Sequence, residues 1–339
     1  MIATPSVSRD ETAVADLLQQ QLTAWGLPVN RKGNNIWTRE ASCSAGKPVI
    51  LLNSHIDTVK PAAGYTRDPF TPAIEDGRLY GLGSNDAGGP LVSLLAAFRY
   101  LVSLPDERPY TLIFAATAEE EVSGRGGVES ILPELGNVDL AIVGEPTGMQ
   151  PAVAEKGLMV LDCTAFGKSG HAARNEGVNA IYQALPAIQW FQTYLFDRVS
   201  QFLGPVKMSV TQIQAGTQHN VVPDTCRFVV DVRVNELYKN TELLSLIKKA
   251  ANVNVQERST RLSSSNIPVS HPVVQRCISL GLTPFGSPTM SDQALMPFTS
   301  IKIGPGQSAR SHSADEFILI DEISQGVKTY VDILDNLHI

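Results

Sequence analysis

This 339-residue sequence has no apolar run of 18 or more residues and therefore no candidate membrane-spanning helix. Its first residues, Met-Ile-Ala-Thr-Pro-Ser, lack the charged-then-apolar pattern of a signal peptide. Lysine and arginine are scattered and the formal net charge is −7, so no basic patch for nucleic acid is expected. We expect a cytoplasmic protein with neither a membrane nor a nucleic acid as partner.

Cysteine is also scarce. The four cysteines lie far apart and form no CxxC pair: Cys43, Cys163, Cys226 and Cys277. This spacing excludes a disulfide framework and a thiolate zinc site, so reduced thiols are expected.

The remaining composition is that of a globular chain long enough for two domains, with 43% hydrophobic and 18% charged residues. The first 150 residues alternate strand and helix patterns, which predicts an α/β fold with a mostly parallel sheet covered on both faces. We expect helices at 11–25 and 90–104 and strands at 49–52, 111–116 and 140–143. A strand at 301–303 and a helix at 322–337 return to this pattern.

Residues 158–262 follow a different order. Their pattern is strand, helix, strand, strand, helix, strand, at 158–165, 179–195, 206–213, 227–234, 241–251 and 254–261. A β-α-β-β-α-β order is typical of a ferredoxin-like α+β sandwich. We therefore predict one domain from residues 1–157 and 269–339, interrupted by an inserted domain at 158–268.

His55 and Asp57 close the first apolar strand. Residues i and i+2 of a strand point to the same side, so Asp57 is placed to hold or polarise the imidazole of His55. Metal-ligating histidines commonly donate their second N–H to a carboxylate in this way. The alternative is a hydrogen-bonded pair with a structural role.

Asp86 lies in a glycine-rich segment, residues 81–89, just before an apolar helix. It is a candidate ligand, but an acidic residue there can also cap the helix. The glycines can instead cradle phosphate, although their spacing fits neither the dinucleotide fingerprint nor a P-loop.

Further chemical residues follow other strands. Glu119, Glu120 and Glu121 come after 111–116, Glu145 after 140–143 and His312 after 301–303. Open α/β sheets bind ligands at the carboxyl ends of their strands, although an acidic run can also be a solvated loop. Two histidines with three carboxylates suit a pair of divalent ions, for which zinc is the first expectation and cobalt or manganese are substitutes.

Together these segments resemble the M20-type family of metal-dependent amidohydrolases and peptidases, which includes acetylornithine deacetylase, succinyl-diaminopimelate desuccinylase, aminoacylase and glutamate carboxypeptidase. The motifs match in order at residues 54–58, 81–89, 117–121, 143–147, 169–172, 219–224 and 304–316. The resemblance implies a zinc-peptidase-like catalytic domain and an inserted domain through which two chains form a homodimer.

The resemblance also implies roles. Asp86 would bridge two zinc ions, with His55 and Glu145 completing one ligand set and Glu121 and His312 the other. Glu120 would be the general base, and Asp57 would support His55. The family commonly has Asp-Glu-Glu where this chain has three glutamates, so a slip of one residue in the alignment would make Glu119 the base.

Other roles implied by the resemblance concern the substrate. His171 would stabilise the oxyanion, in the active site of the partner subunit. Asn220, Arg233 and Ser291 would bind substrate, with Asp292 beside the last of them. Without the resemblance, a lone loop histidine such as His171 is usually structural, and Asn220 and Arg233 could equally be residues of a sheet surface.

The predicted function is therefore metal-dependent hydrolysis of the amide bond of an N-acyl amino acid. The first hypothesis is N-acetylornithine, or a related N-acetyl or N-succinyl ornithine or citrulline, in arginine biosynthesis. The alternatives are desuccinylation of diaminopimelate and a dipeptidase or carboxypeptidase activity. A non-catalytic binding protein has no use for a spare carboxylate beside two cations.

Overall fold

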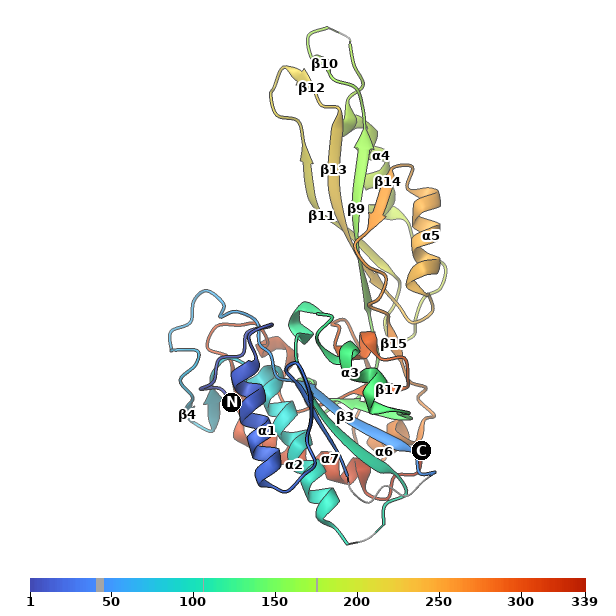
Figure 1. Cartoon of the computed structure of the whole chain (residues 1–339). Helices are drawn as coiled ribbons and strands as arrows, with labels where there is room; N and C mark the ends of the chain where they lie inside the picture. The colour runs from blue at the N-terminus through green and yellow to red at the C-terminus, as the bar shows by residue number, and fades with distance from the viewer. Residues whose placement is uncertain (41–45, 106, 175) are drawn as a thin grey trace. The chain divides into compact units, whose positions relative to one another are not determined.

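The computed structural model describes residues 1–40, 46–105, 107–174 and 176–339, so Cys43 lies outside the described residues. The chain forms two compact units. The larger unit comprises Met1–Val153, Asn266–Phe285 and Ser291–Ile339, and the smaller unit comprises Ala154–Ser265 and Gly286–Met290. Figure 1 shows their elements.

A mixed sheet forms the centre of the larger unit, with the order β1-β2-β6-β3-β7-β17-β8-β15. The strands β6, β3, β7 and β17 run parallel, and β1, β2 and β8 pair antiparallel to their neighbours. This confirms the predicted mostly parallel α/β sheet and adds antiparallel margins. The bounds are β1 (Asn30–Lys32), β2 (Asn35–Arg39), β3 (Val49–His55), β6 (Thr111–Thr117), β7 (Leu140–Val143), β8 (Ala152–Glu155), β15 (Ser265–Asn266), β16 (Phe285–Ser287) and β17 (Ser300–Lys302).

Helices cover both faces of this sheet, so the central strands are buried and mostly apolar. All seven residues of β3 are buried, as expected of a strand between two layers. Helix α2 packs on β3 and β6, and α7 packs on α2, while Ile131 and Leu135 of α3 pack with Leu51 and Ile113. The helices are α1 (Thr12–Ala24), α2 (Gly89–Ser103), α3 (Val128–Leu135), α6 (Pro272–Ser279) and α7 (Ile320–Leu334).

A three-stranded sheet with the order β18-β5-β4 was not predicted. Its strands are β4 (Ala73–Glu75), β5 (Arg78–Tyr80) and β18 (Phe317–Leu319). Phe317, the first residue of β18, pairs antiparallel with Tyr80, the last residue of β5. The segment that follows β5 and the segment that precedes β18 are therefore neighbours, and these segments carry Asp86 and His312.

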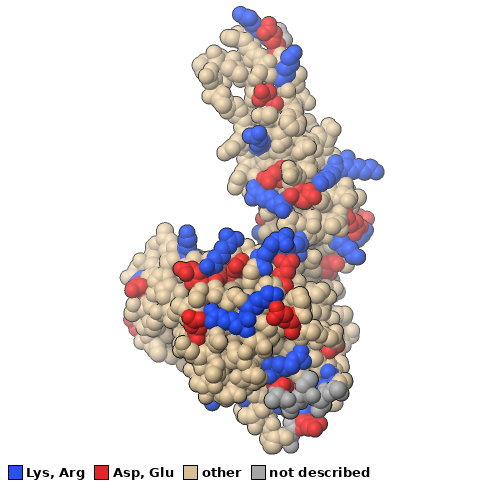
Figure 2. Space-filling model, viewed as in Figure 1, with Lys and Arg blue, Asp and Glu red and all other residues tan. Residues whose placement is uncertain are grey.

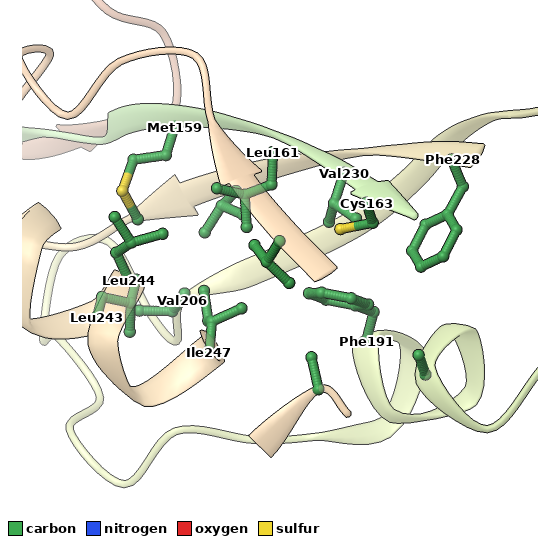
Figure 3. Close-up of a cluster of buried hydrophobic side chains, with 14 of the residues drawn as sticks. Met159, Leu161, Cys163, Phe191, Val206, Phe228, Val230, Leu243, Leu244 and Ile247 are labelled. Atoms are coloured by element: carbon green, nitrogen blue, oxygen red, sulfur yellow. The ribbon is translucent and has the colours of Figure 1, made fainter. Parts of the chain in front are cut away.

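The smaller unit has the predicted β-α-β-β-α-β order. Its antiparallel sheet has the order β11-β13-β9-β14, and the last strand ends at Glu257, earlier than predicted. Buried and half-buried positions alternate along most of β9, so one face of the sheet carries the core shown in Figure 3, where the ring of Phe191 lies 6.0 Å from that of Phe228. The elements are β9 (Gly157–Phe166), α4 (Ala180–Thr193), β11 (Lys207–Ala215), β13 (Thr225–Val234), α5 (Asn240–Ala250) and β14 (Asn254–Glu257), with a separate pair, β10 (Gly170–His171) and β12 (Val221–Val222).

Among the described residues, none of the helices is long and apolar enough to cross a membrane. Cys163, Cys226 and Cys277 are buried free thiols, and burial raises the pKa of Cys163 and of Cys277 to about 12. On the face shown in Figure 2, basic and acidic side chains are interspersed.

Candidate metal centre

Three adjacent parallel strands bring the candidate ligands together. His55 ends β3 and pairs with Thr117, the last residue of β6, while Glu145 follows β7 by two residues. Glu120 and Glu121 begin the short helix η2 (Glu120–Val122) directly after β6. The carboxyl ends of β6, β3 and β7 therefore meet at one edge, the expected location of a ligand site.

His55 lies at the middle of this group and is buried. Its Nε2 is 3.2 Å from Asp86 Oδ1, 3.8 Å from Glu145 Oε1 and 4.0 Å from Glu120 Oε2. Its Nδ1 is 2.8 Å from the backbone oxygen of Asp57, which orients the ring with Nε2 toward the carboxylates. A backbone carbonyl is a usual partner for the second nitrogen of a metal-ligating histidine.

Asp86 lies between two histidines. Its Oδ1 faces His55, and its Oδ2 is 3.6 Å from Nε2 of His312, which is also 2.9 Å from Glu121 Oε2. One carboxylate with each oxygen directed at a different ligand group has the arrangement of a bridge between two ions. The His312 side chain is 53% exposed, so this side of the site is open to solvent.

The residues fit a pair of divalent cations. One ligand atom from each of His55, Asp86 and Glu121 lies within 4.8 Å of the others, and the same holds for His55, Glu120 and Glu145. Oε1 of Glu145 is buried and has no hydrogen-bond partner among the described residues, and a cation would satisfy it. Nitrogen and oxygen donors of this kind suit zinc and similar ions.

The pKa values show the same electrostatic demand. Burial and neighbouring carboxylates raise the pKa values of Glu120 and Glu145 well above the ordinary value, although His55 opposes the shift. Burial alone would lower the pKa of His55, but hydrogen bonds with Asp57 and Asp86 raise it well above 6.5. Positive charge is thus favoured wherever these side chains meet.

Asp86 has opposing influences. Burial raises the pKa of this carboxyl, but the hydrogen bond and charge of His55 outweigh burial and lower it. The hydrogen bond with Glu121 raises the pKa of His312 to about 9. The charged form of the Asp86 carboxyl is therefore favoured.

The turn after β6 distinguishes the three adjacent glutamates. Glu119 adopts a positive φ of 56°, and its Oε2 accepts the N–H of Gly126 at 3.3 Å. A Cβ at Gly124 would clash with the Glu119 side chain, whose Cβ would lie 2.6 Å away, so that side chain would have to move. Glu120, and not Glu119, has a carboxylate oxygen near His55.

Asp57 holds this turn in place. Its Oδ1 accepts the N–H of Glu120 and its Oδ2 the N–H of Glu121, each at 3.1 Å, and Ser8 Oγ donates to Oδ2 at 2.7 Å. Asp57 Oδ1 also lies 3.4 Å from His55 Nδ1. The sequence predicted the link to His55, but it carried no signal for the hydrogen bonds to the glutamate turn.

The alternatives for residues 81–89 are wrong. Asp86 does not cap α2, because the N-cap residue is Gly88, which has no side chain. Nor is the glycine-rich loop free to cradle phosphate, since Gly83, Asn85 and Asp86 donate their backbone N–H groups to Glu316. Glu316 is buried, and burial raises its pKa to about 7.

Ser291 and Asp292 are buried beside β6. Ser291 is the N-cap of η3 (Asp292–Leu295), with Oγ 3.4 Å from the N–H of Gln293. Asp292 accepts a hydrogen bond of 2.7 Å from the Thr117 hydroxyl, and burial raises its pKa to about 6. In this structure Ser291 thus has a capping contact, and its role toward a substrate stays a prediction.

The three other predicted residues lie in the smaller unit. His171 and Asn220 are exposed, and His171 Nδ1 accepts the N–H of Ala173 at 3.2 Å. The guanidinium of Arg233 forms a two-pronged ion pair with Asp231, at 2.9 and 3.0 Å. A planar fork suits a carboxylate, and here that carboxylate belongs to the chain itself.

Comparison with known proteins agrees with this geometry. Residues 51–336 match the family described as peptidase family M20/M25/M40. The chain belongs to this family. It is accordingly a metal-dependent hydrolase, an M20 amidohydrolase or peptidase, and the resemblance seen in the motifs is confirmed.

Two curated relatives carry the same name. A succinyl-diaminopimelate desuccinylase of Stenotrophomonas maltophilia (strain K279a) is 27% identical over 367 residues, covering 99% of this chain and 97% of the relative. A protein of the same name from Paracidovorax citrulli (strain AAC00-1) is 29% identical over 248 residues, covering 66% of this chain and 64% of the relative.

Solved structures share the M20 fold at low identity. The aminopeptidase PepT of Bacillus cereus ATCC 10987 has a TM-score of 0.80 at 19% identity, covering 99% of this chain and 95% of its own. A dinuclear metal-binding M20 peptidase of Bacillus subtilis has a TM-score of 0.74 at 16% identity, covering 98% of this chain and 94% of its own.

We expect Zn²⁺ to stabilise the metal-free protein through this centre. At a free concentration 100 times the Kd, a ligand that binds only the folded state adds about 2.7 kcal/mol to the free energy of unfolding. Thermal unfolding with and without Zn²⁺ measures the effect. His55→Ala should reduce it, because a ligand of one ion is lost, whereas His219→Ala, at an exposed histidine of the smaller unit, should retain it in full. Equal stabilisation of both variants would exclude the site.

Proposed function

We propose that this chain hydrolyses the amide bond of an N-acyl amino acid, with two zinc ions as cofactor and an N-succinyl diamino acid as the first candidate substrate. The observation that carries the proposal is the placement of Asp86 between His55 and His312, with Glu120 beside them. His55, Asp86 and Glu145 would hold one ion, and Asp86, Glu121 and His312 the other. Cobalt and manganese remain alternatives to zinc.

When bound, the two ions would lower the pKa of a water molecule and polarise the amide carbonyl. Glu120 would then accept the proton of the attacking water at Oε2 and deliver it to the amide nitrogen that leaves. Asp57 keeps this turn in position through the N–H groups of Glu120 and Glu121.

Two findings support the succinylated substrate over the acetylated ornithine that the sequence first suggested. The curated relatives are named desuccinylases, and one of them aligns with nearly the whole of this chain. N-Acetylornithine and N-acylated citrulline stay as alternatives. His171, Asn220, Arg233 and Ser291 are retained as candidates for contact with the substrate, and His171 would act on the oxyanion.

The proposal includes a homodimer formed through an inserted domain at residues 158–268, the rest of the chain being the catalytic domain. Strand β11 is an edge of its sheet among the described residues, and edge strands are ready to pair with another chain. On α4, Tyr182 and Leu185 are 67% and 52% exposed. Large exposed apolar side chains beside an open edge favour an interface between two copies.

Glu120→Ala should reduce kcat by about 10²- to 10⁴-fold, because the variant has no group to transfer the proton. Glu119→Ala provides the matched control, since it removes the adjacent carboxylate with its contacts to Gly126 and Arg9. Steady-state hydrolysis measured with each variant, and with a chelator, tests the mechanism. If activity were lost in the Glu119 variant and retained in the Glu120 variant, Glu119 would be the general base. Full activity in the presence of the chelator would exclude metal dependence.

A panel of N-succinyl diaminopimelate, N-acetyl and N-succinyl ornithine and citrulline, and one dipeptide should give the highest kcat/KM for the succinylated diamino acid. The same panel measured with Arg233→Ala tests whether that side chain binds substrate, as a raised KM would indicate. Cleavage of the dipeptide alone would refute the N-acyl assignment.

Light scattering after gel filtration should give twice the chain mass of 36.6 kDa. Charged residues on the exposed face of α4, in the variant Tyr182→Glu with Leu185→Glu, should convert the dimer to the monomer. Leu246→Glu, at a residue of α5 that is 43% exposed, is the control and should leave the dimer intact. A wild-type monomer, or a dimer unaffected by the α4 variant, would contradict this interface.

A further inference from the structure

Glu316 is a buried carboxylate to which the proposed chemistry gives no part. It is only 2% exposed, and both of its oxygens accept backbone hydrogen bonds from the segment that carries Asp86. Oε1 accepts from Asn85 at 2.8 Å and from Asp86 at 2.9 Å, and Oε2 accepts from Gly83 at 3.0 Å. The backbone oxygen of Glu316 accepts a fourth N–H, from Gly81 at 3.0 Å.

The second connection between these segments is Asn85. Its Oδ1 accepts the N–H of Gln307 at 2.9 Å, and its Nδ2 donates to the oxygen of Gln307 at 3.1 Å. Gln307 and Glu316 lie on either side of His312 in the chain. The segment that carries His312 is therefore attached to the Asp86 segment at both of its ends.

The attachment between these two segments affects the ion position beside His312 more than the position beside His55. His55 belongs to β3 and reaches Asp86 through a direct contact of 3.2 Å. His312 lies in a loop and itself adopts a positive φ of 57°. Its Nε2 is 3.6 Å from Asp86 Oδ2. The distance between Asp86 and His312 thus depends on what joins their two loops.

We propose that Glu316 is a positioning residue that sets the distance between Asp86 and His312 and thereby the affinity of the ion held by Asp86, Glu121 and His312. The inference rests on the proposed two-ion function. A carboxylate is suited to this position because it accepts hydrogen bonds at both oxygens and donates none.

Glu316→Gln keeps the shape of the side chain but replaces one oxygen by an NH₂ group. In either orientation of the new amide, its NH₂ group faces at least one of the backbone N–H groups of Gly83, Asn85 and Asp86. Two donors cannot pair, so the segment that carries His312 must shift relative to the segment that carries Asp86. Loss of a partner behind a metal ligand typically reduces metal affinity about 10- to 100-fold. We expect a loss of this size for one ion only.

The experiment is calorimetric titration of the metal-free full-length protein with Zn²⁺. His312→Ala and Glu145→Ala serve as references for loss of the one ion site and of the other. Glu316→Gln should resemble His312→Ala, with one ion weakened by about 10- to 100-fold and the other within twofold of wild type. Equal weakening of both ions, a curve like that of Glu145→Ala, or no change would overturn the proposal.

Glu40→Gln is the matched control, because Glu40 is another buried carboxylate that accepts hydrogen bonds at both oxygens. The backbone N–H of Leu112 donates to one oxygen at 3.0 Å, and the guanidinium of Arg108 donates to the other. Glu40→Gln should leave the affinity for both ions unchanged. A similar loss of affinity in this variant would mean that Glu316 only stabilises the fold in general. Glu316→Asp, which keeps the charge on a shorter side chain, is a milder variant for use if Glu316→Gln fails to fold. It should show the same selective loss.

The titration does not depend on turnover. If the wild-type protein binds two ions but hydrolyses no member of the substrate panel, the proposed substrate class fails and the role of Glu316 stands. If Glu316→Gln binds both ions as wild type does while the wild-type enzyme is active, only the role of Glu316 fails.

Discussion

Repulsion among buried carboxylates is the constraint on which the larger unit depends. Glu120, Glu145 and Asp86 gather around His55, and their side chains are at most 13% exposed. Burying a charge costs several kcal/mol unless an opposite charge compensates it. One buried imidazole does not suffice, because the pKa values of Glu120 and Glu145 are still raised. A pair of divalent cations would resolve this imbalance, so the feature that opposes stability in the metal-free chain would also be the feature that permits the proposed chemistry.

The scaffold holds these groups mainly through backbone amides. Asp57 secures the turn of Glu120 and Glu121 on one side of the site, and Glu316 secures the loop of Asp86 on the other. Each of the two carboxylates uses both oxygens, so each loop is fixed at more than one point. Residues that never touch a metal ion can therefore control where the ligands stand, as is usual for the groups behind a metal centre.

The ligands define the type of bond that is broken, and they leave the substrate open. Proteins of this family share the site and fold, and the relatives found here include desuccinylases, while solved structures of similar fold include an aminopeptidase at 19% identity. Function in such families lies in groups added to a common framework. Under the proposed function, the groups that select the substrate lie outside the set of metal ligands. Arg233, which forms an ion pair with Asp231, is one candidate for such a group.

The sequence by itself determined the elements and the strand ends at which chemistry occurs. Periodicity located β3, β6 and β7, and because parallel strands place their carboxyl ends together, His55, Glu121 and Glu145 were expected at one edge. Only the tertiary structure decided which glutamate of the turn faces His55, that Asp86 is no helix cap, and that Glu316 supports it. The physical reason is separation along the chain: Glu316 and Asp86 are 230 residues apart and meet through the pairing of β18 with β5. Local periodicity carries no information about such a contact.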